Sequence, residues 1–136
     1  MTADLLASVQ QFYGRQMRLS EDGAVDEWAA TFTEDAVFED STEPEPLRGR
    51  DAIRESVRRG VARIAAADLD FRHWFGMVDV EPDADGGVFT RYAALAVVTP
   101  RGGTAALLGN ADCHDHLVPS PGGWLVRHRA VRFDGT

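Results

Sequence analysis

The chain is poor in basic residues, in cysteine and in long apolar runs. Twenty-two acids outnumber fourteen basic residues and give a net charge of -8, which argues against nucleic-acid binding because phosphate contacts need clustered basic side chains. The single cysteine, Cys113, excludes an internal disulfide and a cysteine-based zinc cluster, in agreement with a reducing compartment. No run approaches the ~20 apolar residues of a membrane span, and the N-terminus lacks a signal-peptide pattern. We therefore expect a soluble, cytoplasmic protein.

The length and composition of the chain are typical of one small globular domain. A chain of 136 residues with 44% hydrophobic content is long enough for one core and a small pocket, so we expect a single domain over residues 1–136. Helical patterns come first and strand patterns follow, which indicates the α+β class.

Three helices are predicted in the first half. Apolar side chains recur every three or four residues over 4–18 and over 51–67, so each segment has one face to bury. Between them, Trp28 and Phe32 lie four residues apart on a short amphipathic stretch that we expect to end at Glu34-Asp35.

A sheet of about five strands is predicted for the rest. One strand is expected near Val37, and the others are the runs 69–81, 87–99, 104–118 and 123–133. Glycine- and proline-rich turns separate the four long runs, which predicts an antiparallel meander. The proline-rich loop at 43–49 is long enough to lie over the mouth of a cavity.

Strand alternation places two ionisable side chains among apolar neighbours. Phe71, His73, Phe75 and Met77 are expected on one face of their strand. Asp115 falls on the more apolar face of its own strand. A carboxylate there must hold its proton or find a partner, for which the next strand offers Arg127 or Arg129.

Several segments of the chain resemble one known family: 12–17, 28–38, 47–53, 72–77 and 122–129. Together they resemble the SnoaL-like branch of the nuclear transport factor two-like superfamily. They look most like the small, actinorhodin-type tailoring proteins of aromatic polyketide biosynthesis. The resemblance implies a cone-shaped fold, in which three N-terminal helices pack on a curved, mainly antiparallel sheet and enclose a pocket.

The resemblance also implies which residues carry the chemistry. Relatives often have a histidine at the position of His73 and an acid at the corner after the first helix, which here is Glu21 or Asp22. They commonly have a tyrosine two residues before the aspartate that matches Asp115. Cys113 occupies that position here, so the chain lacks a pocket phenol at this point.

A histidine and a carboxylate that face one dry pocket can remove a proton from carbon and deliver one to a leaving hydroxyl. In this interpretation His73 is the general base or acid, and Glu21 or Asp22 orients its imidazole or shares the transfer. Asp115 is a competing acid if its carboxyl holds the proton. The structural alternatives are a core histidine, helix-capping acids and an ion-paired aspartate. The expected pocket lining is Tyr13, Trp28, Phe38, Trp74, Phe75, Tyr92 and Cys113, with the two tyrosines as hydrogen-bond donors to a substrate carbonyl.

The function predicted from these residues is a cofactor-independent dehydratase or cyclase that acts on a polycyclic aromatic polyketide intermediate. One alternative is a non-catalytic binding module that shields an intermediate or assists a partner enzyme. Another is an epoxide hydrolase or isomerase on the same scaffold. His114 and His116 share a strand face, but no third ligand is recognisable, so no metal is expected. Because the family often pairs sheet to sheet, we also expect a homodimer.

Overall fold

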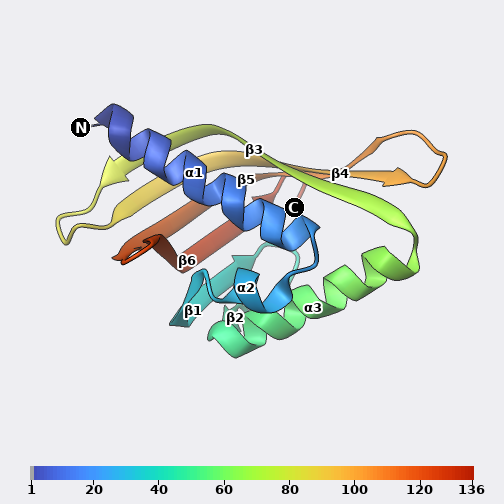
Figure 1. The fold of residues 1–136 in the computed structure, drawn as a ribbon, viewed down its shortest axis with the longest axis horizontal. Coiled ribbons are helices and arrows are strands. Elements are labelled where there is room, and N and C mark those ends of the chain that lie inside the picture. The colour runs from blue at the N-terminus through green and yellow to red at the C-terminus, as the bar shows by residue number, and fades with distance from the viewer. Residues whose placement is uncertain (1) are drawn as a thin grey trace.

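The computed structural model describes residues 2–136 as three helices packed on a curved sheet (Figure 1). The helices are α1 (Thr2–Glu21), α2 (Val25–Ala29) and α3 (Arg50–Ala66). The strands are β1 (Phe32–Asp40), β2 (Leu47–Arg48), β3 (Leu69–Pro82), β4 (Val88–Pro100), β5 (Ala106–Ser120) and β6 (Gly123–Phe133). α1 lies across the sheet against β3 and β6, while α3 packs on β1 and β3.

The sheet has six strands in the order β2-β1-β6-β5-β4-β3. β3 to β6 form the expected antiparallel meander, and β1 joins β6 in parallel. The predicted number of strands was one too low, because the loop at 43–49 contains β2, which pairs with β1. None of the loop residues lines the cleft described below. The α+β cone is therefore confirmed, with one added edge strand.

The boundary between α2 and β1 differs from the prediction. α2 ends at Ala29, where Thr31 donates its hydroxyl to the Trp28 carbonyl over 2.6 Å, and Thr31 then accepts the Val126 N–H over 2.8 Å. Phe32 already belongs to β1, so Glu34 and Asp35 lie within the strand and do not end the helix. Pairing with β6 therefore outweighs the helical spacing of the two aromatic residues.

A bulge in β3 changes the expected face of Met77. Strand pairing shifts between Gly76 and Asp79, and Met77 adopts a φ of 53° with 90% of its surface exposed. Val78 is partly buried against the core in its place. Met77 therefore leaves the face that His73 and Phe75 share, because the extra residue inverts the alternation beyond this point.

The concave side of the sheet and the helices enclose the core. Phe32, Tyr92 and Cys113 are almost completely buried there, and each large apolar side chain contributes roughly 1.5–3 kcal/mol by leaving water. Among the side chains that the structure describes, four polar ones are buried with them: Gln16, Thr90, Asp115 and Arg129. Within residues 2–136, no helix is long and apolar enough to cross a membrane.

Candidate active site

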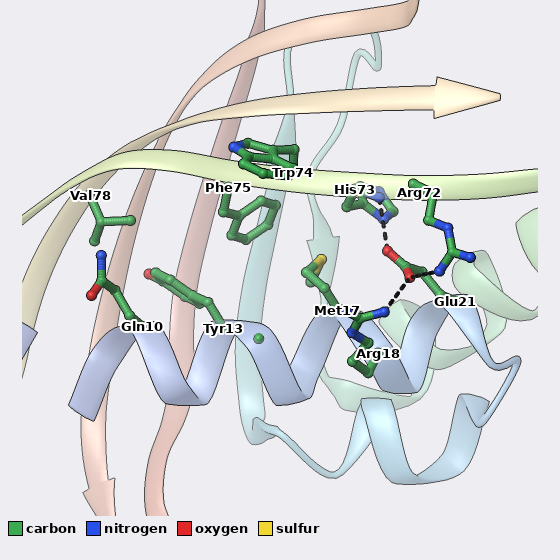
Figure 2. A pocket seen from close by; sticks show the side chains of 11 residues that line it. Gln10, Tyr13, Met17, Arg18, Glu21, Arg72, His73, Trp74, Phe75 and Val78 are labelled. Atoms are coloured by element: carbon green, nitrogen blue, oxygen red, sulfur yellow. Dashed lines mark hydrogen bonds and ion pairs between the residues drawn. The ribbon is translucent and has the colours of Figure 1, made fainter. Parts of the chain in front are cut away.

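A cleft of about 610 Å³ lies between α1 and β3 (Figure 2). β3 is the last strand of the sheet, so its outer edge meets no other strand and α1 runs along it. α1 contributes one stripe of side chains at three- and four-residue spacing. The lining residues are Gln10, Tyr13, Gly14, Met17, Arg18 and Glu21 from α1, and Arg72, His73, Trp74, Phe75 and Val78 from β3.

The two ends of this cleft differ in polarity. Toward Gln10 and Val78, the walls are the rings of Tyr13 and Phe75, which meet edge to face with centroids 5.3 Å apart. The opposite end carries the charged side chains around His73 (Figure 2). A flat apolar group fits the first end, and the reactive part of the same molecule would then face the second.

Glu21 joins the last turn of α1 to the open edge of β3. Its side chain is only 7% exposed, and Oε2 accepts the main-chain N–H of His73 over 3.0 Å. Oε1 accepts Nη1–H of Arg72 over 3.1 Å and lies 3.8 Å from Nη1 of Arg18. Glu21 therefore contacts the backbone of His73 and not the imidazole that it was predicted to orient.

The imidazole of His73 lines the charged end of the cleft. It lies between Phe71 and Phe75, at centroid distances of 4.6 and 6.4 Å. Nδ1 is buried and has no hydrogen-bond partner among residues 2–136. Burial lowers the pKa of His73 below the ordinary 6.5; Glu21 opposes this shift, while Arg129 adds to it. The ring is therefore neutral at pH 7 and able to accept a proton.

Asp115 lies beneath the cleft at the centre of a buried network. Tyr13 donates to Oδ2 over 2.6 Å and Tyr92 to Oδ1 over 3.1 Å. Arg129 donates Nε–H to Oδ1 over 3.0 Å and Nη2–H to Oδ2 over 2.9 Å. Four donor atoms thus bind the two carboxylate oxygens. Of the two partners that the sequence offered for Asp115, Arg127 and Arg129, the structure forms the ion pair with Arg129.

Arg129 is the cation of this network and is only 3% exposed. Its Nη2 also donates to Oε1 of Gln16 over 2.8 Å. The guanidinium carbon lies 5.7 and 5.8 Å from the ring centroids of Phe75 and Tyr13, which form the cleft wall. Burial alone would lower the pKa of Arg129, but the charge of Asp115 raises it on balance. The guanidinium therefore stays charged behind that wall.

The buried hydroxyl and thiol groups are held in their neutral forms. Burial, with the charge of Asp115, raises the pKa of both Tyr13 and Tyr92. Both phenol protons point to Asp115, so in this structure neither is free for a substrate carbonyl. Burial also raises the pKa of Cys113 to about 12, so Cys113 is a core thiol rather than a nucleophile.

Comparison with known proteins places the chain in a family. The family described as the SnoaL-like domain matches residues 1–130. The chain belongs to the SnoaL-like family. Aln2 from a Streptomyces species is 32% identical, with a TM-score of 0.90 over 98% of this chain and 94% of Aln2. ActVI-ORFA from Streptomyces coelicolor is 27% identical, with a TM-score of 0.88 over 98% of each chain.

A third solved structure adds a ligand. This protein from Catenulispora acidiphila, in complex with S-DNPA, is 31% identical to the SnoaL-like chain, with a TM-score of 0.84 over 97% of this chain and 95% of the other. No curated protein matches the chain. The matches confirm the nuclear transport factor two-like fold and the predicted resemblance to actinorhodin-type proteins.

In this SnoaL-like protein the predicted site residues separate into two groups. Those that line the cleft are His73, Glu21, Tyr13, Trp74 and Phe75. Those that do not are Asp22, Asp115, Trp28, Phe38, Tyr92 and Cys113. Asp22 is exposed beyond the end of α1, and the other five pack in or against the core.

Sequence reasoning missed several lining residues. Gln10 and Met17 lie three before and four after Tyr13, so helical spacing alone identifies them. Arg18 and Arg72 can be identified as lining residues only once the fold shows that the open edge of β3 lies against the end of α1. Among residues 2–136, no group of three or more potential ligands is placed to hold a metal ion.

Proposed function

We propose that this SnoaL-like protein is a cofactor-independent enzyme that dehydrates, or dehydrates and cyclises, a polycyclic aromatic polyketide intermediate in the cleft between α1 and β3. The observation that carries the proposal is the neutral imidazole of His73, which lines the charged end of an aromatic-walled cleft. The match to ActVI-ORFA supports a polyketide-related role, and the S-DNPA complex of the Catenulispora protein supports a small-molecule ligand.

The first step is removal of a proton from the carbon beside a substrate carbonyl. Neutral His73 accepts this proton, and the rings of Tyr13 and Phe75 hold the flat part of the substrate against the cleft wall. The resulting enolate expels the hydroxyl on the neighbouring carbon. Because burial lowers the pKa of His73, the ring stays neutral to a lower pH than an exposed histidine does.

The two carboxylates have supporting roles in this mechanism. Glu21 holds the backbone of His73 against α1, and its charge favours the imidazolium that forms during the reaction. Asp115 fixes Tyr13 from beneath the cleft. Asp22 is exposed and has no part in the proposed reaction.

The test is a cofactor-free assay with a tricyclic β-hydroxy ketone, in which mass spectrometry follows the loss of one water. We expect wild-type protein to dehydrate the ketone and His73→Ala to lose at least about 10²-fold in rate, the usual contribution of a positioned base. His114→Ala is the matched control, because the side chain of His114 is 59% exposed on another strand, outside the cleft. Equal turnover by wild type and His73→Ala would contradict the assignment.

One observation favours the binding module as the second candidate. The carboxylates of Glu21 and Asp115 are both held by arginines, so the cleft has no second free acid. Saturable ligand binding without any mass change, in wild type and His73→Ala alike, would support a module that shields an intermediate. Incorporation of ¹⁸O from solvent into product would instead indicate epoxide opening, and a product of unchanged mass an isomerase.

We further propose a cytoplasmic homodimer formed through the outer face of the sheet. Trp74 is 70% exposed, and its cross-strand partner Leu95 is also exposed. Arg91 and Asp112 pair on the neighbouring strands, so the face carries both signs of charge and can complement itself. Sedimentation velocity should give twice the chain mass of 14.9 kDa, and Leu95→Glu, which lies outside the cleft, should shift the species to one chain.

A further inference from the structure

The cleft contains few groups that can exchange a proton. Of its eleven lining residues, all of them described, only Tyr13, Glu21 and His73 carry an acid or base other than a guanidinium. Any second acid needed for elimination must therefore be Glu21 or Tyr13. The hydrogen bonds of these two residues decide whether either can serve.

Glu21 is engaged at both oxygens. Oε2 accepts the His73 main-chain N–H, and Oε1 pairs with Arg72 and Arg18. To protonate a leaving hydroxyl, this carboxyl would first have to bind a proton and give up these charged partners. Its contacts therefore suit a hydrogen-bond acceptor, not a proton donor.

Tyr13 also has no proton to donate into the cleft. Its proton is directed to Asp115 over 2.6 Å, away from the cleft, and Thr90 Oγ1 lies 2.6 Å from the same phenol oxygen. Since the phenol proton is used, Thr90 is the donor in that contact. Arg129 keeps Asp115 an acceptor through two further hydrogen bonds, so the network has no spare proton to return.

The wall that faces β3 offers no replacement. Between Tyr13 and Arg18, α1 contributes Gly14 and Met17 to the lining, neither of which has an exchangeable side-chain proton. Proton-exchanging chemistry is thus confined to the β3 side, at His73. A substrate in the cleft meets its base and any acid from the same direction.

We infer that His73 alone carries both proton transfers, so that hydrogen and hydroxyl leave from the same face of the substrate in a syn elimination. The imidazole takes the proton from the carbon beside the carbonyl, and the electrons of that C–H bond form the enolate. These electrons then make the new C=C bond as the C–O bond breaks. The imidazolium returns the same proton to the departing oxygen, which gives water and neutral His73. The inference rests on the proposed dehydration.

The experiment uses a tricyclic β-hydroxy ketone with one deuterium on the carbon beside the carbonyl, either cis or trans to the hydroxyl. Wild-type protein should remove the cis deuterium with water and leave the trans deuterium in the product, as read by mass spectrometry. An enzyme-free incubation and the recovered substrate correct for solvent exchange. Loss of the trans label, or equal loss of both, would overturn the inference. No dehydration of either compound would instead defeat the proposed function on which it rests.

Glu21→Gln tests the remaining acid separately. The amide oxygen still accepts the His73 N–H, so the edge contact is kept while the carboxylate is lost. Whatever its rate, this variant should release the cis label with the same selectivity as wild type. A change of selectivity to the trans label would show that Glu21 takes part in proton transfer and would overturn the single-residue mechanism.

Discussion

The cleft and the network beneath it contain similar groups in different states. The cleft has the carboxylate of Glu21 with Arg72, and the network has that of Asp115 with Arg129. The ring of Tyr13 lies at both. In the network every polar group is paired, and Asp115 accepts four hydrogen bonds. In the cleft, the His73 imidazole has no partner among residues 2–136. The difference indicates that Asp115 is held within the fold as a hydrogen-bond acceptor, whereas the His73 ring lines the cleft with one nitrogen unpaired.

The strongest test of this contrast is removal of the buried cation. Arg129→Met leaves Asp115 charged, buried and without its ion-pair partner, so we expect the free energy of unfolding to fall by about 3–5 kcal/mol. Urea denaturation measures the change. Arg127→Met, an exposed neighbour on β6, is the matched control and should stay within about 0.5 kcal/mol of wild type.

A double variant separates lost charge from lost packing. Arg129→Met combined with Asp115→Asn leaves no unpaired charge and keeps an oxygen for one of the phenols, so part of the lost stability should return. If the double variant is less stable than Arg129→Met alone, the ion pair does not explain the buried network.

The next effect in size concerns the phenols. Tyr13→Phe and Tyr92→Phe each remove one donor to the charged Asp115, and a hydrogen bond to a charged group contributes about 1.5–3 kcal/mol. We expect Tyr13→Phe to be the more costly, because its bond is 2.6 Å long against 3.1 Å for Tyr92. Thermal and urea unfolding compare the two. The reverse order would mean that Asp115 is held mainly from the Tyr92 side.

A smaller effect is expected from pH. The pKa of His73 is lowered in the fold, so between that value and 6.5 the unfolded chain binds a proton that the folded chain does not. The free energy of unfolding should therefore fall as the pH drops below 6.5. His73→Leu should remove this part of the slope in urea titrations between pH 7 and 5. An unchanged slope would show that the ring titrates normally in the fold.

Much of the fold followed from local patterns, and each exception has an identifiable structural cause. The apolar spacing predicted α1, and the glycine- and proline-rich turns predicted the meander from β3 to β6. Both patterns depend only on residues close in sequence. Met77 was misplaced because strict alternation was continued past Gly76, the isolated strand glycine beside the bulge that inverts the faces. Phe32 was misplaced because its partner, Val126, lies in a distant strand.

The candidate site was less predictable than the fold, because it depends on which groups meet. His73 and Glu21 were expected together and do line one cleft. Alternation gave the buried position of Asp115 but could not choose between Arg127 and Arg129 as its partner, and β6 turns only Arg129 inward. The open edge of β3, which brings Arg72 to Glu21, is a property of the sheet order and not of any segment.

The smallest expected effect is a shift in the pKa of His73 when the charge of Glu21 is removed. The carboxylate of Glu21 raises the pKa of His73 against the lowering effect of burial, so Glu21→Gln should lower that pKa further. NMR titration of the His73 ring protons measures the shift in the free protein, without any substrate. Asp22→Asn, the adjacent exposed acid, is the matched control and should move the titration less. Because the glutamine keeps the acceptor for the His73 N–H, a shift confined to Glu21→Gln assigns the effect to charge and not to a displaced strand. Equal shifts in the two variants would mean that Glu21 influences the imidazole no more than a solvated acid does.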